Sequence, residues 1–186
     1  MIGAAKIKAF SERLEGRLVD PDDGEYDTAR TIWNAMIDKR PALIARCKSQ
    51  LDVVASVEFA REHDLLVSIR GGGHNVAGNA VCDDGLMIDL SLMKGIEIDA
   101  DMRTIKAQPG CTLGDLDRAS DRHGLAVPTG IVSETGIAGL TLGGGVGWLV
   151  RKYGLTCDNL ISAEVVTAAG DAVKASAEEN EDLFWG

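Results

Sequence analysis

Residues 69–79 read Ile-Arg-Gly-Gly-Gly-His-Asn-Val-Ala-Gly-Asn, and they follow an apolar run (residues 65–69) that is typical of a buried β-strand. Consecutive glycines allow positive φ angles and let backbone N–H groups approach a ligand with no Cβ in the way. Two interpretations fit this stretch: a loop that cradles a phosphate or pyrophosphate, and a glycine-rich turn with a histidine at its tip. Arg70 favours the first, because its permanent charge would attract an anion.

The 186 residues carry a net charge of −10 and no cluster of lysine and arginine. Nucleic acids and anionic membranes are bound through basic patches, so neither is an expected partner. There is no run of 18 or more apolar residues, and the N-terminal residues are too charged for a secretory signal. We expect a cytoplasmic protein that folds as one sizeable domain or as two small lobes with a shared core.

Cysteine and histidine spacing gives no sign of a metal site. The four cysteines lack paired spacing and are expected to be reduced, mostly buried thiols: Cys47, Cys82, Cys111 and Cys157. The three histidines are far apart, and no structural metal site is expected. His63 and His123 fall at the ends of expected helices, where a role in packing or with the helix dipole is expected.

Apolar periodicity and capping signals predict four longer helices, over residues 2–14, 27–41, 49–63 and 112–123. Asp27 is the expected N-cap of the second, and Ser49-x-x-Asp52 and Thr112-x-x-Asp115 have capping-box spacing. The expected buried faces are Ala29, Trp33, Met36 and Ile37 in the second helix, and Val53, Val54, Val57 and Ala60 in the third. Gly124 would end the fourth helix in the left-handed conformation.

Strands are expected over residues 42–47, 65–69 and 85–90, with hairpins at 96–107 and 160–175 and a short helix near the end, within 178–185. The first two strands and the helix between them predict a parallel pair with a right-handed crossover. Pro109-Gly110 is a clear break. We therefore divide the chain into an N-terminal helical segment (residues 1–40), a first lobe (41–107) and a second lobe (108–186).

A second glycine-dense region runs from Gly130 to Gly147. Neither region fits the dinucleotide fingerprint, because the first lacks its third glycine at Asn75 or Val76, the second has Trp148 in that place, and no P-loop Gly-Lys-Ser/Thr follows. Two such regions favour an elongated ligand, such as a dinucleotide, held by backbone between two lobes. A structural α+β domain without a ligand explains them poorly, since each glycine costs roughly 0.5–1 kcal/mol relative to alanine in regular structure.

Six motifs occur in one order along the chain: Arg-Gly-Gly-Gly-His (70–74), Gln-Pro-Gly (108–110), Pro-Thr-Gly (128–130), Gly-Leu-Thr-Leu-Gly-Gly-Gly-Val-Gly-Trp-Leu (139–149), Arg-Lys-Tyr-Gly-Leu (151–155) and Asp-Asn-Leu (158–160). This set resembles the FAD-binding domain of FAD-linked oxidases of the vanillyl-alcohol oxidase and p-cresol methylhydroxylase superfamily, in its berberine-bridge-enzyme-like branch. The resemblance extends from about Tyr26 to Trp185.

The resemblance implies an α+β fold of two lobes with FAD extended between them. It implies that the first lobe wraps the pyrophosphate with residues Arg70, Gly71, Gly72, Gly73, His74, Asn75 and Gly78. It implies second-lobe contacts from residues Thr129, Gly130, Thr135, Gly136, Gly139, Gly143, Gly144, Gly145 and Gly147, with the backbone of Val165 at the adenine end.

In this family a histidine at the position of His74 is bonded to the 8α-methyl group of the flavin. A neutral imidazole nitrogen is a suitable nucleophile for that bond. The other interpretation, a hydrogen-bonded loop histidine, applies if this member lacks the linkage. Some relatives add a second bond from a cysteine, but the matching segment here (residues 130–136) has Val132, so no double linkage is expected.

Relatives continue beyond the position of Trp185 into a substrate-binding domain, so we expect this chain to be truncated before that domain. The leading hypothesis is the FAD-binding portion of an oxidase in which the substrate passes a hydride to FAD and dioxygen then accepts the electrons. The alternative is a non-catalytic flavin- or nucleotide-binding module, or a degenerate fragment without turnover. Exposed apolar surface would then favour a second copy of this chain or a completing chain. No general base, substrate or metal is assigned.

Overall fold

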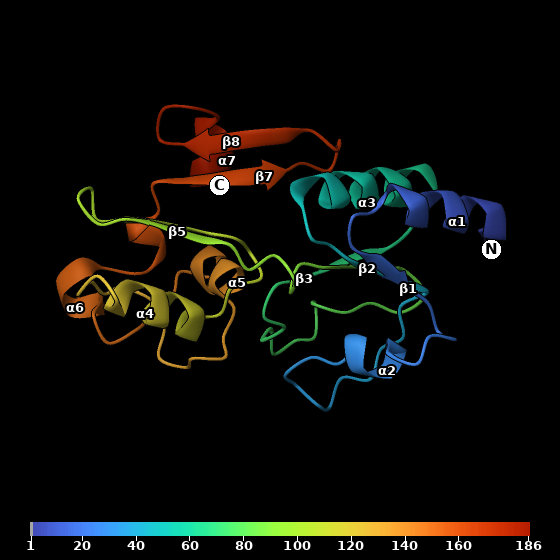
Figure 1. Cartoon of the computed structure of the whole chain (residues 1–186), viewed down its shortest axis with the longest axis horizontal. Coiled ribbons are helices and arrows are strands. Elements are labelled where there is room, and N and C mark those ends of the chain that lie inside the picture. Colours follow the sequence, from blue (N-terminus) through green and yellow to red (C-terminus); the bar gives the residue numbers. More distant parts are fainter. Residues whose placement is uncertain (1) are drawn as a thin grey trace.

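The computed structural model describes residues 2–186 and shows a mixed helix and strand fold (Figure 1). In chain order, the elements through the last strand of the main sheet are α1 (Ala4–Arg13), β1 (Arg17–Val19), α2 (Tyr26–Ala29), β2 (Leu43–Arg46), α3 (Gln50–Glu62), β3 (Val67–Arg70) and β4 (Leu86–Asp89). They are followed by β5 (Ile96–Asp99), β6 (Thr104–Ala107), α4 (Leu113–Asp121), α5 (Ile137–Leu142), α6 (Val150–Tyr153), the 3-10 turn η1 (Cys157–Asn159), β7 (Ser162–Val166), β8 (Ala172–Ser176) and α7 (Glu181–Trp185).

The main sheet has the strand order β1-β2-β4-β3, with β2, β4 and β3 parallel and β1 antiparallel to β2. The predicted strands before and after α3 are therefore present and parallel. They are not hydrogen-bonded neighbours, because β4 lies between them and pairs with both. All four residues of β4 are buried, which is typical of a central parallel strand.

Side chains that alternate along β2 and β4 build a core on each face of this sheet. Leu43 and Leu86 belong to one cluster, with Phe10 of α1 and Phe59 of α3. The two phenyl rings stack with centroids 4.1 Å apart, which fixes α1 against α3. A second cluster on the opposite face contains Val19, Tyr26, Ala29, Ile44, Val81 and Met87.

The prediction of a buried strand before the glycines is wrong for one side of that strand. Ser68 of β3 is buried, but Val67 and Ile69 are exposed. Val67 and Ile69 pair with Leu86 and Ile88, so they lie on the face of the sheet that packs against α1 and α3. They are exposed because β3 is an edge strand that pairs only with β4, and among the described residues the cover of that face does not extend over it.

The helix predicted from Asp27 to Pro41 is also wrong. Only Tyr26–Ala29 is helical, and Glu25 occupies the N-cap position in place of Asp27. Trp33 and Met36 were expected in the core and are 63% and 90% exposed. Residues 31–34 instead form hydrogen bonds with the loop that follows β3, and these tertiary contacts outweigh a helical pattern that is weak in propensity.

The helix α3 begins at its predicted cap, but only half of the capping box forms. The Ser49 side chain accepts the Asp52 N–H at 3.4 Å. The fully buried Asp52 carboxylate accepts instead from the N–H groups of Glu15, Gly16 and Lys48 at 2.8 to 3.0 Å. A buried carboxylate needs several donors, and the tertiary fold supplies them from outside the helix. The buried face is likewise rotated: Asp52, Ala55, Ser56, Phe59 and Ala60 are buried, while Val53, Val54 and Val57 are only half-buried.

Other predictions are confirmed. Thr112 and Asp115 form a complete capping box at the start of α4, and Gly124 adopts φ = +64° just after that helix. The hairpins β5–β6 and β7–β8 and the helices α1 and α7 are present. The β7–β8 hairpin lies beside α3 in Figure 1, and Arg61 donates to the carbonyl of Ala169 in its turn.

The segment predicted as helical (residues 1–40) also supplies β1 to the main sheet through its pairing with β2. The proposed division at residues 40 and 107 stays a prediction. Within residues 2–186, no helix is both long enough and apolar enough to cross a membrane.

Candidate functional site

The glycine loop (residues 70–78) begins where β3 ends, beside the carboxyl end of β4, the usual location of ligand sites in parallel sheets. Gly73 and Gly78 adopt φ angles of +71° and +77°. The backbone N–H groups of residues 71–74 have no hydrogen-bond acceptor within the described chain. Successive free N–H groups in such a turn form a concave site for an anion.

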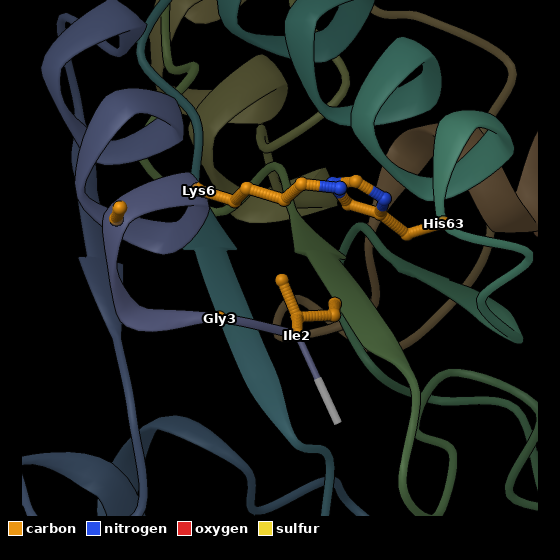
Figure 2. Close-up of a pocket in the computed structure, with 5 residues that line it drawn as sticks. Ile2, Gly3, Lys6 and His63 are labelled. Carbon is orange, nitrogen blue, oxygen red and sulfur yellow. The ribbon is translucent and has the colours of Figure 1, made fainter.

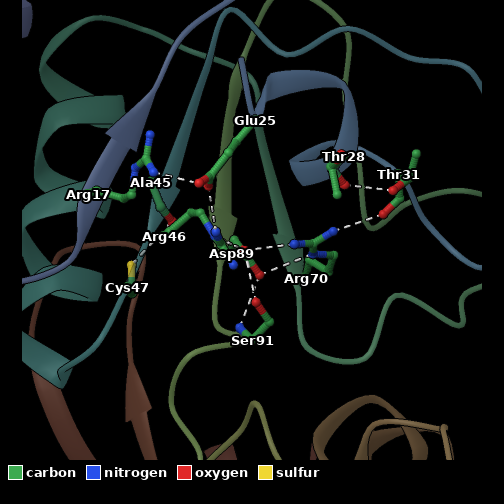
Figure 3. A network of polar contacts seen from close by, with 10 residues as sticks. All are labelled: Arg17, Glu25, Thr28, Thr31, Ala45, Arg46, Cys47, Arg70, Asp89 and Ser91. Atoms are coloured by element: carbon green, nitrogen blue, oxygen red, sulfur yellow. Dashed lines mark hydrogen bonds and ion pairs between the residues drawn. The ribbon is translucent and has the colours of Figure 1, made fainter. Parts of the chain in front are cut away.

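Arg70 is tied to the protein by its own hydrogen bonds (Figure 3). Its Nε and Nη2 donate to the Asp89 carboxylate at 3.1 and 2.7 Å, and its Nη1 donates to the Thr31 carbonyl at 2.8 Å. The guanidinium therefore shares its charge with Asp89, which makes it a support of the loop. The charge expected to attract an anion is largely compensated.

Asp89 is fully buried at the end of β4 and is the centre of this network (Figure 3). Besides Arg70, it accepts from Arg46 Nε at 3.2 Å and from the N–H and hydroxyl of Ser91 at 3.0 Å each. Burial alone would raise the pKa of this carboxyl, but the bonds and charge of Arg70, with the two bonds from Ser91, lower its pKa below the usual value. Asp89 thus remains ionised and holds two arginines in place.

The strap (residues 31–34) runs alongside the glycine loop. Besides the bond between Arg70 and Thr31, the Trp33 N–H donates to the Gly73 carbonyl at 3.1 Å, and Asn34 Nδ2 donates to the Val76 carbonyl at 2.8 Å. The Trp33 indole stacks on the His74 imidazole with ring centroids 5.4 Å apart and planes at 21°. Sequence analysis placed Trp33 in a helix core and missed this contact.

The second glycine-rich region meets the glycine loop directly. A Cβ on Gly136 would lie 2.7 Å from the Cα of Gly72, so the two backbones touch where neither residue has a side chain. Thr135 Oγ1 lies 3.5 Å from His74 Nδ1. The structure therefore brings together Gly72, His74, Thr135 and Gly136, four residues that the sequence assigned to one site.

An open cavity of about 410 Å³ lies at this junction. Its lining includes four predicted site residues, Arg70, Gly71, Gly72 and His74. The remaining lining residues were not predicted: Thr31, Ile32, Trp33, Ser91, Lys94, Gly110, Thr112 and Glu134. In the sequence, Gly110 belonged to the Gln-Pro-Gly motif, Thr112 was a predicted helix cap and Glu134 lay within the second glycine-rich region, but none of the eight was predicted to be a site residue. The other predicted site residues do not line this cavity.

The glycines of the second region serve two different purposes. A Cβ on Gly147 would overlap the Thr129 carbonyl, so glycine is required there by packing against backbone. A Cβ on Gly130 would lie 2.5 Å from Leu140 Cδ1, the end of a side chain that would have to shift. Gly78 of the first lobe is favoured as glycine by its φ of +77° and by the Ile37 side chain, which a Cβ would approach to 2.8 Å. By contrast, a Cβ on Gly139 would have no atom within 4 Å. The open side of α5 at Gly139 is therefore available to a ligand.

The remaining residues predicted to contact the cofactor lie in turns, at a helix cap and in a hairpin. The Asn75 side chain accepts the Asn79 N–H at 3.0 Å. Gly144 and Gly145 have φ angles of +101° and +80°, Gly143 caps α5, and Val165 pairs with Val173 in the β7–β8 hairpin. Their contacts with a cofactor remain predictions.

A second cavity, of about 320 Å³, lies between α1 and the end of α3, and Figure 2 shows the Lys6 side chain extended toward His63 across it. It contains none of the residues singled out by the glycine patterns. Within residues 2–186, no group of three or more His, Cys, Asp or Glu side chains could hold a metal ion. The cavity at the glycine loop is therefore the candidate site.

Comparison with known proteins agrees with this geometry. The family model described as an FAD binding domain matches residues 41–176, which include both glycine-rich regions. The chain belongs to this FAD-binding domain family. The fold is that of the p-cresol methylhydroxylase-type domain, and the relatives are FAD-linked oxidoreductases and berberine-bridge-enzyme-like oxidases, as the sequence motifs predicted.

Among curated relatives, the domain is 42% identical over 172 residues to (R)-6-hydroxynicotine oxidase of Paenarthrobacter nicotinovorans, covering 92% of this chain and 38% of that protein. It superposes on berberine-bridge-enzyme-like 1 of Physcomitrella patens with a TM-score of 0.91 at 30% identity, covering 96% of this chain and 39% of the other.

A third structure is the glucooligosaccharide oxidase of Acremonium strictum, which carries a 6-S-cysteinyl, 8α-N1-histidyl FAD. Its TM-score is 0.90 at 32% identity, covering 97% of this chain and 38% of the other. The FAD-binding domain thus spans about two fifths of the length of the relatives it matches.

The residues present fit FAD. The free N–H groups of residues 71–74 are suited to a pyrophosphate, and Gly139 leaves room for a ligand against α5. His74 lines the same cavity and is a nucleophile of the kind that forms covalent links.

Proposed function

We propose that this FAD-binding domain is part of a flavin-dependent oxidase in which the substrate passes a hydride to FAD and dioxygen accepts the electrons from the reduced flavin. The observation that supports this best is the cavity between the two glycine-rich regions, with unpaired N–H groups on one side and His74 at its edge. The names of the relatives, (R)-6-hydroxynicotine oxidase and glucooligosaccharide oxidase, support the oxidase assignment.

The proposed tasks of this chain are binding and orientation. When bound, FAD would supply the electron-accepting chemistry. Residues 71–74 would hold the pyrophosphate through backbone N–H groups. The buried Asp89 and its partner Arg70 would keep that loop in position, because they tie its first residue to β4 and to the strap.

We further propose that His74 forms a covalent bond to the 8α-carbon of FAD. The net reaction would replace one C–H bond of the methyl group and one N–H bond of the imidazole by a C–N bond. The two electrons and two protons released would pass to dioxygen and give hydrogen peroxide. A second bond from a cysteine is not proposed, because Val132 stands in the segment where some relatives have one.

The test is to incubate the purified chain with FAD in air, remove free flavin by gel filtration, and measure bound flavin by absorbance. Acid precipitation and intact mass then separate attached from bound FAD. We expect one FAD per chain, resistant to acid. His74→Ala should keep bound FAD but lose the acid-stable fraction, while His63→Ala, in the other cavity, should behave as the wild type.

Electron transfer to dioxygen is tested on the same purified complex. The bound flavin is reduced with dithionite without oxygen, excess reductant is removed, and air is admitted. Re-oxidation with one hydrogen peroxide per flavin is the expected result. A flavin that stays reduced in air would contradict the oxidase assignment, and a chain that never retains FAD would favour the degenerate alternative.

A further inference from the structure

We propose that Trp33 is a positioning residue for His74: its indole fixes the plane of the imidazole at the edge of the cavity. This inference rests on the proposed function, since it concerns how His74 is presented to FAD. The sequence motifs do not include Trp33.

The strap is attached to the glycine loop at three points that bracket His74. Thr31 accepts from Arg70, Trp33 donates to Gly73, and Asn34 donates to Val76. The partners in the loop are therefore three residues apart and lie on both sides of His74 in sequence. The Trp33 backbone is bonded to the residue immediately before His74, so the two backbones lie side by side and the indole can stack on the imidazole.

The Trp33 side chain is too exposed for packing in the core to explain its position. The side chain is 63% exposed, yet it stacks on His74 and lines the cavity. Met36, three residues along the same segment, is 90% exposed and does not line the cavity. A large aromatic side chain at the edge of a ligand site is better explained by contacts within that site.

Stacking restrains an imidazole without blocking its chemistry. The indole covers a face of the His74 ring, whereas the nitrogen lone pair that would form a bond lies in the ring plane and points from the edge. On that edge, Thr135 Oγ1 lies 3.5 Å from Nδ1. The ring is thus fixed by Trp33 from the first lobe and approached by a hydroxyl from the second. Orientation of this kind alters reaction rate more than binding affinity.

The first test compares Trp33→Ala, Trp33→Phe and Met36→Ala with the wild type. The rate of attachment is followed by intact mass after mixing with FAD, and the affinity for FAD is measured in a His74→Ala background, where no bond forms. We expect Trp33→Ala to slow attachment about tenfold to a hundredfold, with affinity changed less than about threefold. Trp33→Phe should restore most of the rate, and Met36→Ala should match the wild type.

A second measurement needs no flavin. In the isolated wild type, the ring current of the indole should shift the His74 ring protons upfield in the NMR spectrum. Trp33→Ala should remove that shift, while the circular dichroism spectrum and the melting temperature stay close to those of Met36→Ala.

Three outcomes would overturn the inference. Equal attachment rates in Trp33→Ala and the wild type would show that the stack is irrelevant, although FAD binding would stand. A parallel fall in rate, affinity and melting temperature would make Trp33 a general structural support. A wild type that binds FAD but never attaches it would remove the role of His74 and that of Trp33 with it, whereas a wild type that binds no FAD would refute the proposed function itself.

Discussion

Gly72 and Gly136 touch backbone to backbone, and a Cβ on Gly72 would lie 2.5 Å from the Cα of Gly136. This contact joins the glycine loop after β3 to the segment that begins α5. Glycine is required at both positions because backbone atoms, which cannot move aside as a side chain can, fill the space. The contact therefore sets how the two glycine-rich regions face the same cavity.

Gly72→Ala is expected to destabilise the fold by about 1–3 kcal/mol, as overpacking usually does. Gly139→Ala is the matched control, because its Cβ would meet no atom within 4 Å and alanine favours a helix. Urea unfolding of the two variants provides the comparison. If Gly139 faces the cofactor, its alanine variant should keep stability yet bind FAD more weakly. Equal stability of Gly72→Ala and the wild type would show that the two regions separate easily.

Asp89→Asn should lower stability by about 3–5 kcal/mol, because it leaves the partly buried Arg46 and Arg70 without their shared counter-charge. The free energy of unfolding in urea measures the effect. The control is Asp27→Asn: this carboxylate is exposed and its partner Arg30 also pairs with Asp38, so the loss should be less than about 1 kcal/mol. A loss no larger than that of the control would mean that the network is dispensable.

Stability should fall as the pH is lowered below the ordinary range of aspartate. Burial opposes ionisation of Asp89 and Asp115, but Arg70 and Ser91 lower the pKa of the first, and Lys94 and Thr112 lower the pKa of the second. A carboxyl whose pKa is lower in the folded state stabilises the fold above its unfolded pKa, and this contribution is lost as the pH falls through the folded pKa. Urea midpoints at pH 7, 5 and 3 measure it, and Asp89→Asn should show a smaller decrease.

The four cysteines should differ in reactivity. Cys47, Cys82 and Cys111 are buried, whereas Cys157 is half-buried, and burial raises the pKa of the Cys47 thiol to about 12. Iodoacetamide at pH 8 should therefore modify Cys157 first, as read by mass spectrometry of peptides. In urea all four should react. Early modification of Cys47 in the native protein would contradict the packing around β2.

Thr112→Ala should cost about 1 kcal/mol, since it removes the hydroxyl that accepts the Asp115 N–H at 3.3 Å in the capping box of α4. Thr112→Ser retains the hydroxyl and should be close to the wild type. Thermal unfolding of both variants is the measurement, and a Ser variant as unstable as the Ala variant would assign the loss to the methyl group.

Local signals in the sequence predicted most helices and strands, but little of how these elements are arranged relative to one another. The hairpins β5–β6 and β7–β8 and the cap of α4 follow from turn residues and capping spacing that act over a few residues. The order of the main sheet does not, because the insertion of β4 between β2 and β3 depends on pairing between strands far apart in the chain. The exposure of side chains on β3 also depends on this strand order, which places β3 at the edge of the sheet.

The candidate site divides in the same way. Glycine spacing and the ordered motifs identified His74, the loop after β3 and the FAD-binding family. They could not identify Trp33, because its partner is 41 positions away in sequence and its own neighbours suggested a helix. Similarly, Arg70 was expected to face an anion, whereas the fold places the buried Asp89 beside it.

The sequence by itself determined where the backbone is free of side chains and where a nucleophilic imidazole stands, since these are properties of residue type and order. Only the tertiary structure decided which glycines are needed for packing, as at Gly147, and which leave open space, as at Gly139. The physical reason is that space and charge compensation depend on the atoms that approach from elsewhere in the chain. Those atoms come together only when the whole chain has folded.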